Sequence, residues 1–235
     1  MAKEKKISII IFPGSNCDRD LFVAVEKCLG IKPEYIWHNC SHIKTTDMIL
    51  IPGGFSFGDY LRAGIIATKS PAIKEVIRFC KKGVPIIGIC NGFQILTECG
   101  LLDGALIKNS NQLFKCEKIN LKVINNETVF TKNFKLSEVI SMPIAHSQGN
   151  YFVKPDDLKK IEDNDQIIFK YSSIFGDVSE KYNPNGSVSN IAGISNKKKN
   201  VMGLMPHPER AIENFYNGDD GIKFFENLKD LIWIK

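Results

Sequence analysis

The sequence predicts an α/β fold in which helices flank a mainly parallel sheet and additional antiparallel strands extend it. In the first hundred residues, short continuous apolar runs alternate with segments whose apolar residues recur at helical spacing. Continuous apolar runs are typical of parallel strands that are covered on both faces, and the alternation is typical of β-α units. After Gly100 the apolar runs are shorter and less regular, which favours antiparallel additions.

The first β-α unit is expected over residues 7–30. Residues 7–12 read ISIIIF, an apolar run of strand length. Residues 18–30 then place four apolar side chains on one helical face: Leu21, Phe22, Val25 and Leu29. Gly30 follows as a helix stop signal, so a strand and then a helix are predicted here.

The same signals predict the remaining elements. Further strands are expected at residues 33–37, 48–51, 84–89, 117–124, 166–171, 190–195 and 201–205. A helix is expected over residues 70–83, with Ser70 as N-cap, Pro71 at the first helical position and Gly83 beyond the end. Two more helices are expected, from residue 91 to 99 and from about 219 to 232, and NKKKN at 196–200 reads as a turn. No internal repeat, low-complexity tract or linker interrupts the chain, so we expect a single domain spanning residues 1–235.

Composition indicates an ordinary globular protein. The chain has 235 residues, 43% of them hydrophobic and 24% charged, enough to bury a sizeable core. Its net charge of +5 comes largely from MAKEKK at residues 1–6 and KKK at residues 197–199. Both segments read as solvated ends or turns, so we expect no nucleic-acid partner.

The cysteines and the apolar runs indicate the compartment. Seven cysteines are scattered without a C-x-x-C pair, which predicts neither a disulfide framework nor a zinc ribbon. No apolar stretch approaches the ~18 residues of a membrane-spanning helix, and the run at residues 7–12 is too short for a signal peptide. We therefore expect a cytoplasmic protein with reduced thiols and no membrane association.

Residues 88–92 read GICNG and place Cys90 between two glycines, where a strand ends and a helix begins. A buried cysteine that packs like a small apolar residue would explain this. The alternative is a nucleophile elbow, in which glycines permit a tight strand-to-helix turn that presents the nucleophile. At the helix N-terminus the dipole would favour a thiolate.

Two other segments follow apolar runs, where open α/β sheets gather ligands. MPHPER (205–210) carries His207 and Glu209, which an extended chain would point to the same side, so that the carboxylate could fix the imidazole tautomer. IPGGFSFGDYLRAG (51–64) matches no phosphate loop. Backbone N–H groups of Gly53 and Gly54, with that of Asn91, could instead stabilise an oxyanion. A solvated histidine and a simple glycine turn are the alternatives.

His38, Cys40 and His42 alternate in WHNCSH and could face one side of an extended strand as metal ligands. The polar end of a strand that runs into a loop explains the pattern equally, and the segment offers no fourth ligand. We therefore expect no metal site.

Taken together, these motifs resemble a known family. GICNGFQ is similar to the G-x-C-x-G-x-Q elbow of class I, triad-type glutamine amidotransferases, HPE to their His-x-Glu pair, and PGG to their oxyanion loop. FPGSNCDRD, PGGFSFGDYLRAG, MPIAH and GLMPHPER resemble, more narrowly, the glutaminase subunits of phosphoribosylformylglycinamidine synthases that exist as separate chains. The resemblance covers residues 7–212 and implies a flavodoxin-like class I glutamine amidotransferase fold.

The resemblance also implies roles. Cys90 would be the nucleophile, His207 the base and then the acid, Glu209 the orienting carboxylate, and Gln94 with Gly54 the glutamine and oxyanion contacts. Glutamine would be hydrolysed through a γ-glutamyl thioester, and ammonia would pass to a large synthetase subunit, with a small third subunit also expected. ATP and Mg would bind that partner, and this chain would need no cofactor.

One departure and two rival readings remain. Residues 145–149 read AHSQG, with Ser147 and Gln148 where the family usually has glycine and glutamate. A cysteine-elbow hydrolase or redox-sensing protein would share the elbow, but it would explain neither Gln94 nor the pair formed by His207 and Glu209. A catalytically silent scaffold subunit would not require an intact triad.

Overall fold

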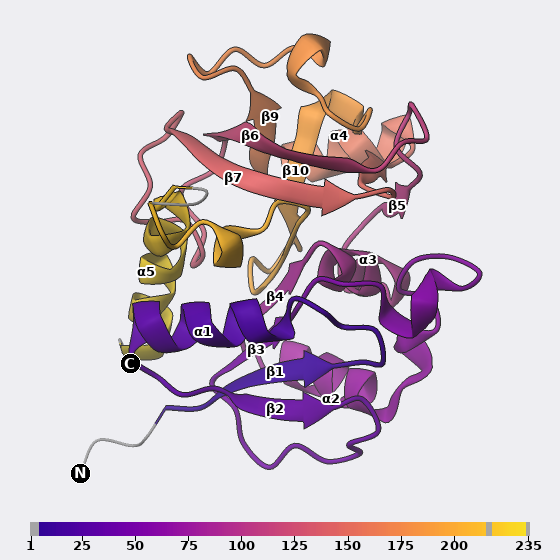
Figure 1. The fold of residues 1–235 in the computed structure, drawn as a ribbon, viewed down its shortest axis with the longest axis vertical. Coiled ribbons are helices and arrows are strands. Elements are labelled where there is room, and N and C mark those ends of the chain that lie inside the picture. The colour runs from indigo at the N-terminus through magenta and orange to yellow at the C-terminus, as the bar shows by residue number, and fades with distance from the viewer. Residues whose placement is uncertain (1–4, 215–217, 234–235) are drawn as a thin grey trace.

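The computed structural model describes residues 5–214 and 218–233 (Figure 1). Its strands are β1 (Ile7–Ile11), β2 (Glu34–Trp37), β3 (Met48–Ile51), β4 (Ile86–Ile89), β5 (Ala105–Ile107), β6 (Lys115–Val123), β7 (Val139–His146), β8 (Asn150–Phe152), β9 (Ile167–Ser172), β10 (Ile191–Ser195) and β11 (Val201–Leu204). Its α-helices are α1 (Asp18–Leu29), α2 (Pro71–Lys81), α3 (Asn91–Glu98), α4 (Pro155–Asp163) and α5 (Asp220–Trp233).

Nine strands form one sheet in the order β2-β1-β3-β4-β11-β10-β9-β6-β7, and β5 pairs separately with β8. The first five strands of this order are parallel to one another. Strands β3, β4 and β11 are buried along their whole length because helices cover both faces of this part of the sheet. In Figure 1, α1 and α5 lie on the near side of the parallel strands, and α2 and α3 lie behind them.

The rest of the sheet is antiparallel, from β11 through β10, β9 and β6 to β7. Buried residues alternate with partly exposed ones along β7, as expected for a sheet with one face toward solvent. Every strand expected from the sequence is present within two residues of its predicted bounds. The expected turn at residues 196–200 joins β10 to β11.

The structure also contains elements that the sequence reading missed: β5, β7, β8 and α4. Strands β5 and β8 have three residues each, too few to show a period. Strand β7 contains Pro143, which argues against a central strand but is tolerated here because β7 is the edge of the sheet. Ser70 does occupy the N-cap of α2, but its side chain makes no capping bond; its Oγ lies 3.3 Å from Nδ1 of His38.

Because the first five strands of the sheet order are parallel, the carboxyl ends of four of them lie at the same edge of the sheet. Strands β1, β3, β4 and β11 all end there, and each continues into a segment singled out by motif or by position. Within the described residues, no helix is long and apolar enough to cross a membrane; α5, at 14 residues, falls short of the ~20 that a bilayer requires.

Candidate active site

Cys90 occupies a sharp turn between β4 and α3. Its backbone has φ 51° and ψ −105°, a conformation that L residues rarely adopt, and it serves as the N-cap of α3. The flanking glycines make the turn possible. A Cβ on Gly92 would lie 2.1 Å from the carbonyl oxygen of Ile51, and one on Gly88 would lie 2.5 Å from the carbonyl oxygen of Gly92. Such local strain is typical of functional sites and corresponds to the predicted elbow.

His207 and Glu209 follow β11 and form a buried pair. Nδ1 of His207 lies 2.6 Å from Oε1 of Glu209, and both side chains are almost fully buried. The predicted extended conformation is wrong, because a 3-10 turn covers Pro208–Arg210. The turn still brings the two side chains together, and His207 N–H donates to the carbonyl of Pro143 at 2.9 Å.

Charge sets the protonation of His207. Burial is the largest single influence and lowers the pKa of the imidazole, but the carboxylate of Glu209 and the sulfur groups of Cys90 and Cys17 together outweigh it, so the pKa lies well above its ordinary value. The site therefore favours a protonated imidazole beside Cys90. Such a cation stabilises a neighbouring thiolate.

The glycine loop after β3 packs directly on the backbone that follows β1. Gly54 has φ 135°, and a Cβ there would lie 2.7 Å from the carbonyl oxygen of Gly14 and 2.8 Å from the nitrogen of Asn16. Gly53 lies under the cysteine and histidine: a Cβ there would lie 2.8 Å from Cε1 of His207 and 3.4 Å from Cβ of Cys90. The structure therefore brings the glycine loop, the elbow and the His207 turn together.

Asn91 and Gln94, on the first turn of α3, hydrogen-bond to the segments on either side of the cavity. Asn91 accepts from Ser56 N–H at 3.0 Å and donates to Oδ1 of Asp59 at 3.2 Å and to Oε1 of Gln94 at 2.8 Å. Gln94 donates in turn to the main-chain oxygen of Gln148 at 2.7 Å. Burial raises the pKa of Asp59 to about 6, although the bond from Asn91 acts in the opposite direction.

The departure at residues 147–148 leaves this network intact. Both contacts use main-chain oxygens: Gln148 accepts from Gln94, and Ser147 accepts from Asn109 N–H at 2.9 Å. Nδ1 of His146 lies 3.2 Å from Oδ1 of Asn109, and burial lowers the pKa of His146 to about 4. A change of side chain at either position therefore does not remove these bonds.

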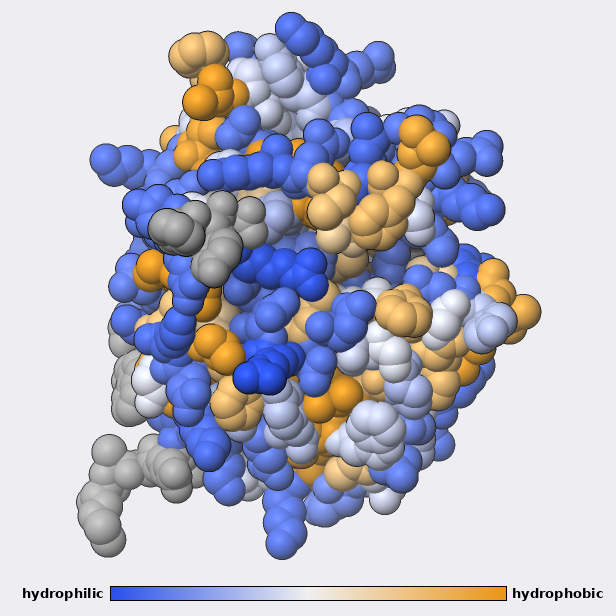
Figure 2. Space-filling model, in the orientation of Figure 1, coloured by the Kyte–Doolittle hydropathy of each residue, from blue (hydrophilic) through white to orange (hydrophobic). Residues whose placement is uncertain are grey.

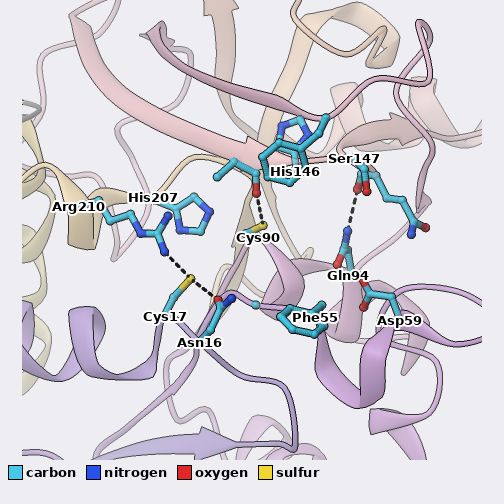
Figure 3. A pocket seen from close by; sticks show the side chains of 14 residues that line it. Asn16, Cys17, Phe55, Asp59, Cys90, Gln94, His146, Ser147, His207 and Arg210 are labelled. Atoms are coloured by element: carbon cyan, nitrogen blue, oxygen red, sulfur yellow. Dashed lines mark hydrogen bonds between the residues drawn. The ribbon is translucent and has the colours of Figure 1, made fainter.

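A cavity of about 310 Å³ opens over these groups (Figure 3). Of the predicted residues, Gly54, Cys90, Gln94 and His207 line it, and Glu209 lies behind His207. His146, in the AHSQG segment discussed above, also lines it, whereas the sequence reading missed several lining residues: Asn16, Cys17, Phe55, Asp59, Phe114 and Arg210. The rule that ligands gather at strand ends could have found Asn16 and Cys17, which follow β1.

Cys17 is a second buried thiol in this site. It donates to Oδ1 of Asn16 at 3.2 Å and accepts from the guanidinium of Arg210 at 3.1 Å. Burial raises the pKa of Cys17, while His207 and Arg210 act in the opposite direction.

The WHNCSH segment has a different arrangement from the one a metal site would need. Strand β2 ends at Trp37, and Cys40 Sγ donates to the carbonyl of His42. The three side chains therefore do not share one face of a strand. Among the described residues, the group that brings metal-ligating atoms together is Cys17, His207 and Glu209.

Comparisons with known proteins agree with this geometry. The model of the CobB/CobQ-like glutamine amidotransferase domain matches residues 4–227. The subunit PurQ of phosphoribosylformylglycinamidine synthase from Chlorobaculum tepidum is 49% identical over 222 residues, covering 94% of this chain and 95% of the relative. PurQ from Chlorobium luteolum is also 49% identical over 222 residues, covering 94% and 96%.

Solved structures confirm the fold. A chain in the structure of PurLQS from Thermotoga maritima is 40% identical, with a TM-score of 0.85 over 96% of this chain and 97% of that one. A glutamine amidotransferase from the same organism is 17% identical and matches in fold alone, with a TM-score of 0.56 over 88% of this chain and 76% of that one. The chain belongs to the family of CobB/CobQ-like glutamine amidotransferases.

Proposed function

We propose that this chain is the glutaminase subunit of a phosphoribosylformylglycinamidine synthase and supplies ammonia to de novo purine biosynthesis. The observation that carries the proposal is the buried pair of His207 and Glu209 beside Cys90, which sits at a strained elbow. Relatives of nearly the same length that carry this name, 49% identical, support the specific reaction.

Cys90 is the proposed nucleophile. Its thiolate adds to the side-chain amide carbon of glutamine and forms a tetrahedral oxyanion. When the carbon–nitrogen bond breaks, the imidazolium of His207 gives its proton to the departing nitrogen, and ammonia leaves. Water then attacks the γ-glutamyl thioester, His207 takes a proton from that water, and glutamate is released as the thiolate reforms.

Glu209 supports both proton transfers. Its bond to Nδ1 leaves Nε2 as the nitrogen that exchanges protons, and its charge stabilises the imidazolium. The raised pKa of His207 suits the first role of this residue, because the protonated form must be present when ammonia departs.

Backbone N–H groups are the proposed oxyanion donors. Asn91 opens α3, where an N–H group has no carbonyl partner within the helix, and Gly53 and Gly54 supply the facing loop. Loss of one such donor typically lowers turnover by ~10²-fold to 10³-fold.

The cavity suits a substrate the size of an amino acid. At about 310 Å³ it falls at the lower end of the ~300–1,000 Å³ range of small-molecule sites. Gln94 lines it, with its amide fixed by Asn91 and the carbonyl of Gln148, so its proposed role is to shape the glutamine site.

The synthetase partners complete the reaction. This chain has no phosphate-loop motif and is proposed to need no cofactor, so the large subunit binds ATP, Mg and formylglycinamide ribonucleotide and converts this substrate into formylglycinamidine ribonucleotide with the ammonia. Exposed Phe55 and Phe114 line the cavity, and the exposed apolar or aromatic residues Tyr60, Leu61 and Leu113 lie in the same two chain segments. Figure 2 shows apolar patches on an otherwise hydrophilic face. We place the large subunit, with a small third subunit in the assembly, on this apolar rim.

Seven free cysteines in the described residues support a reducing, cytoplasmic setting.

Labelling tests the nucleophile. A glutamine analogue that carries a halomethyl ketone in place of the side-chain amide should alkylate Cys90 before the other six cysteines, and glutamine should protect it. Peptide mass spectrometry reads the site, with exposed Cys116 as an internal control for general thiol reactivity. Equal labelling of Cys90 and Cys116 would contradict the assignment, and it would favour a structural cysteine.

A further inference from the structure

A carboxylate with no role in the proposed reaction lines the glutamine cavity. Asp59 lies in the loop after β3, and it is the one carboxylate among the described residues that line the cavity. Glu209, the acid of the triad, lies behind His207 and is bonded to it. Ser147 and Gln148, where the sequence departs from the family, contribute uncharged side chains to the lining. Asp59 therefore supplies the negative charge of the cavity outside the triad.

The carboxylate of Asp59 is incompletely compensated. Its Oδ1 accepts from Nδ2 of Asn91 at 3.2 Å, and within the described part of the chain this side chain forms no ion pair and accepts no other hydrogen bond. Asp59 is half-buried, and burial raises its pKa to about 6, with no positively charged side chain of the described residues acting to lower it. Removing a carboxylate from water costs free energy unless a cation or several donors compensate the charge. A cationic group on a ligand would compensate it.

The proposed mechanism sets the direction of glutamine in the cavity. His207 must reach the departing nitrogen, so the carbon chain of the substrate extends away from His207. Figure 3 shows Asp59 beside Gln94, on the other side of Cys90 from His207. Asn91 follows Cys90 in the chain, and its side chain donates to Asp59. The carboxylate therefore lies within reach of a substrate that spans about 5 Å from its amide carbon to its α-nitrogen.

We propose that Asp59 binds the α-ammonium group of L-glutamine and thereby selects an amino acid over other primary amides. This assignment rests on the proposed function, because it places the side-chain amide at Cys90. A hydrogen bond between an ammonium group and a carboxylate is roughly twice as strong as one between neutral groups. The α-ammonium group does not change during the reaction, so it contributes equally to binding of the substrate and of the transition state. Its loss should therefore raise KM and leave kcat nearly unchanged.

The test compares two substrates that differ at the α-carbon alone. Glutaramate, the monoamide of glutaric acid, has a hydrogen where L-glutamine has the ammonium group. The assembled synthase is assayed with ATP and formylglycinamide ribonucleotide, and mass spectrometry measures the product, glutamate or glutarate. The native enzyme should show a kcat/KM at least about tenfold higher for L-glutamine than for glutaramate. Asp59→Asn should lower kcat/KM for L-glutamine by at least about tenfold, through KM, and change that for glutaramate by less than about twofold.

Asparagine isolates the charge of Asp59. Its side-chain oxygen can still accept from Asn91, and asparagine tolerates the positive φ of 53° at this position. Asp157→Asn is the matched control, because Asp157 is an exposed carboxylate on α4 that pairs with Lys160. This control should leave the kinetics of both substrates unchanged.

Four results would overturn the ammonium site. In Asp59→Asn these are an equal loss for the two substrates, which indicates a structural role, an unchanged kcat/KM for L-glutamine, or a loss confined to kcat. The fourth is an equal kcat/KM of the native enzyme for both substrates, a measurement that needs no variant and so does not depend on how Asp59→Asn folds.

The same assay separates this site from the proposed function. Glutamate release by the native synthase with unchanged kinetics in Asp59→Asn would refute the ammonium site and leave the proposed function intact. A native synthase that releases no glutamate would contradict the proposed function and, with it, the ammonium site.

Discussion

A single methyl group at Gly53 should disable the proposed active site without unfolding the chain. The Cβ of Gly53→Ala would lie 2.8 Å from Cε1 of His207, about 0.6 Å inside the 3.4 Å at which ordinary contact begins. The backbone of Gly53 lies outside the left-handed region, and alanine keeps the N–H group. The main effect is therefore a displaced imidazole.

The size of the effect follows from this displacement. A shift of ~1 Å in a catalytic group can cost ~10²-fold in rate, so a shift of about 0.6 Å should lower kcat by about tenfold to a hundredfold. The assay measures glutamate release by the assembled synthase, with ATP and formylglycinamide ribonucleotide present. Synthesis supported by added ammonium salts should remain, because it bypasses this site.

Gly30→Ala is the matched control. Gly30 is the C-cap of α1, away from the cavity. A Cβ on Gly30 would have no atom within 4 Å. Its φ of 68° should cost about 1 kcal/mol of stability and leave glutamate release unchanged. Retention of most of the native kcat in Gly53→Ala, or equal loss of ammonium-supported synthesis, would refute the reasoning.

The other predictions concern the nucleophile, the pair, activation and stability. Cys90→Ala in the assembled enzyme should abolish glutamine-dependent synthesis and spare the ammonium-dependent reaction; loss of both in a folded complex would indicate a structural cysteine. Glu209→Gln should lower kcat less than His207→Ala, since the base remains; the reverse order in steady-state assays would contradict the assigned roles. The isolated chain should release glutamate slowly and accelerate when the synthetase subunits, ATP and formylglycinamide ribonucleotide are added, whereas full turnover alone would exclude activation by a partner. Glu75→Gln should lower the free energy of unfolding by about 1–3 kcal/mol at neutral pH, because Arg78 and the N–H of Ile43 lose a charged acceptor. Bonds from Arg78 lower the pKa of Glu75 to about 2, so this stabilisation is complete above its ordinary value of 4.5 and is lost as pH falls toward 2; urea titrations should show a flatter acid limb in the variant.

The parallel half of the sheet could be predicted because burial on both faces leaves a strong signature. Strands β3 and β4 are continuous apolar runs, and Gly30 and Pro71 mark helix ends by backbone geometry that few other residues share. Helix α4 carried similar signals, Pro155 at its start and acidic residues in its first turn, but it buries only Ile161. A helix with one buried position shows no apolar period.

The site divides in the same way. Cys90 could be found because its strained turn requires glycines beside it, and these form a local motif. Gly53 could be found because only glycine fits its close contact with His207. Asp59 and Phe114 enter the site only through tertiary packing, from the loop after β3 and from the segment before β6. No local sequence period distinguishes such residues from ordinary loop positions.

The loop after β3 connects the proposed partner surface to the residues around Cys90. Phe57, Asp59 and Leu61 all have positive φ, at 52°, 53° and 68°, a conformation that costs about 1 kcal/mol or more for each such residue. The loop is also exposed and apolar at Leu61, which is 94% accessible. Its inner side is bonded to Asn91, which adjoins Cys90 and lies at the start of the helix that carries Gln94. A subunit that covers the apolar side chains would bury them and select one conformation of a strained segment. The bonds of Asn91 would carry that selection to the glutamine cavity, so we expect partner docking to be coupled to oxyanion stabilisation through this contiguous set of contacts.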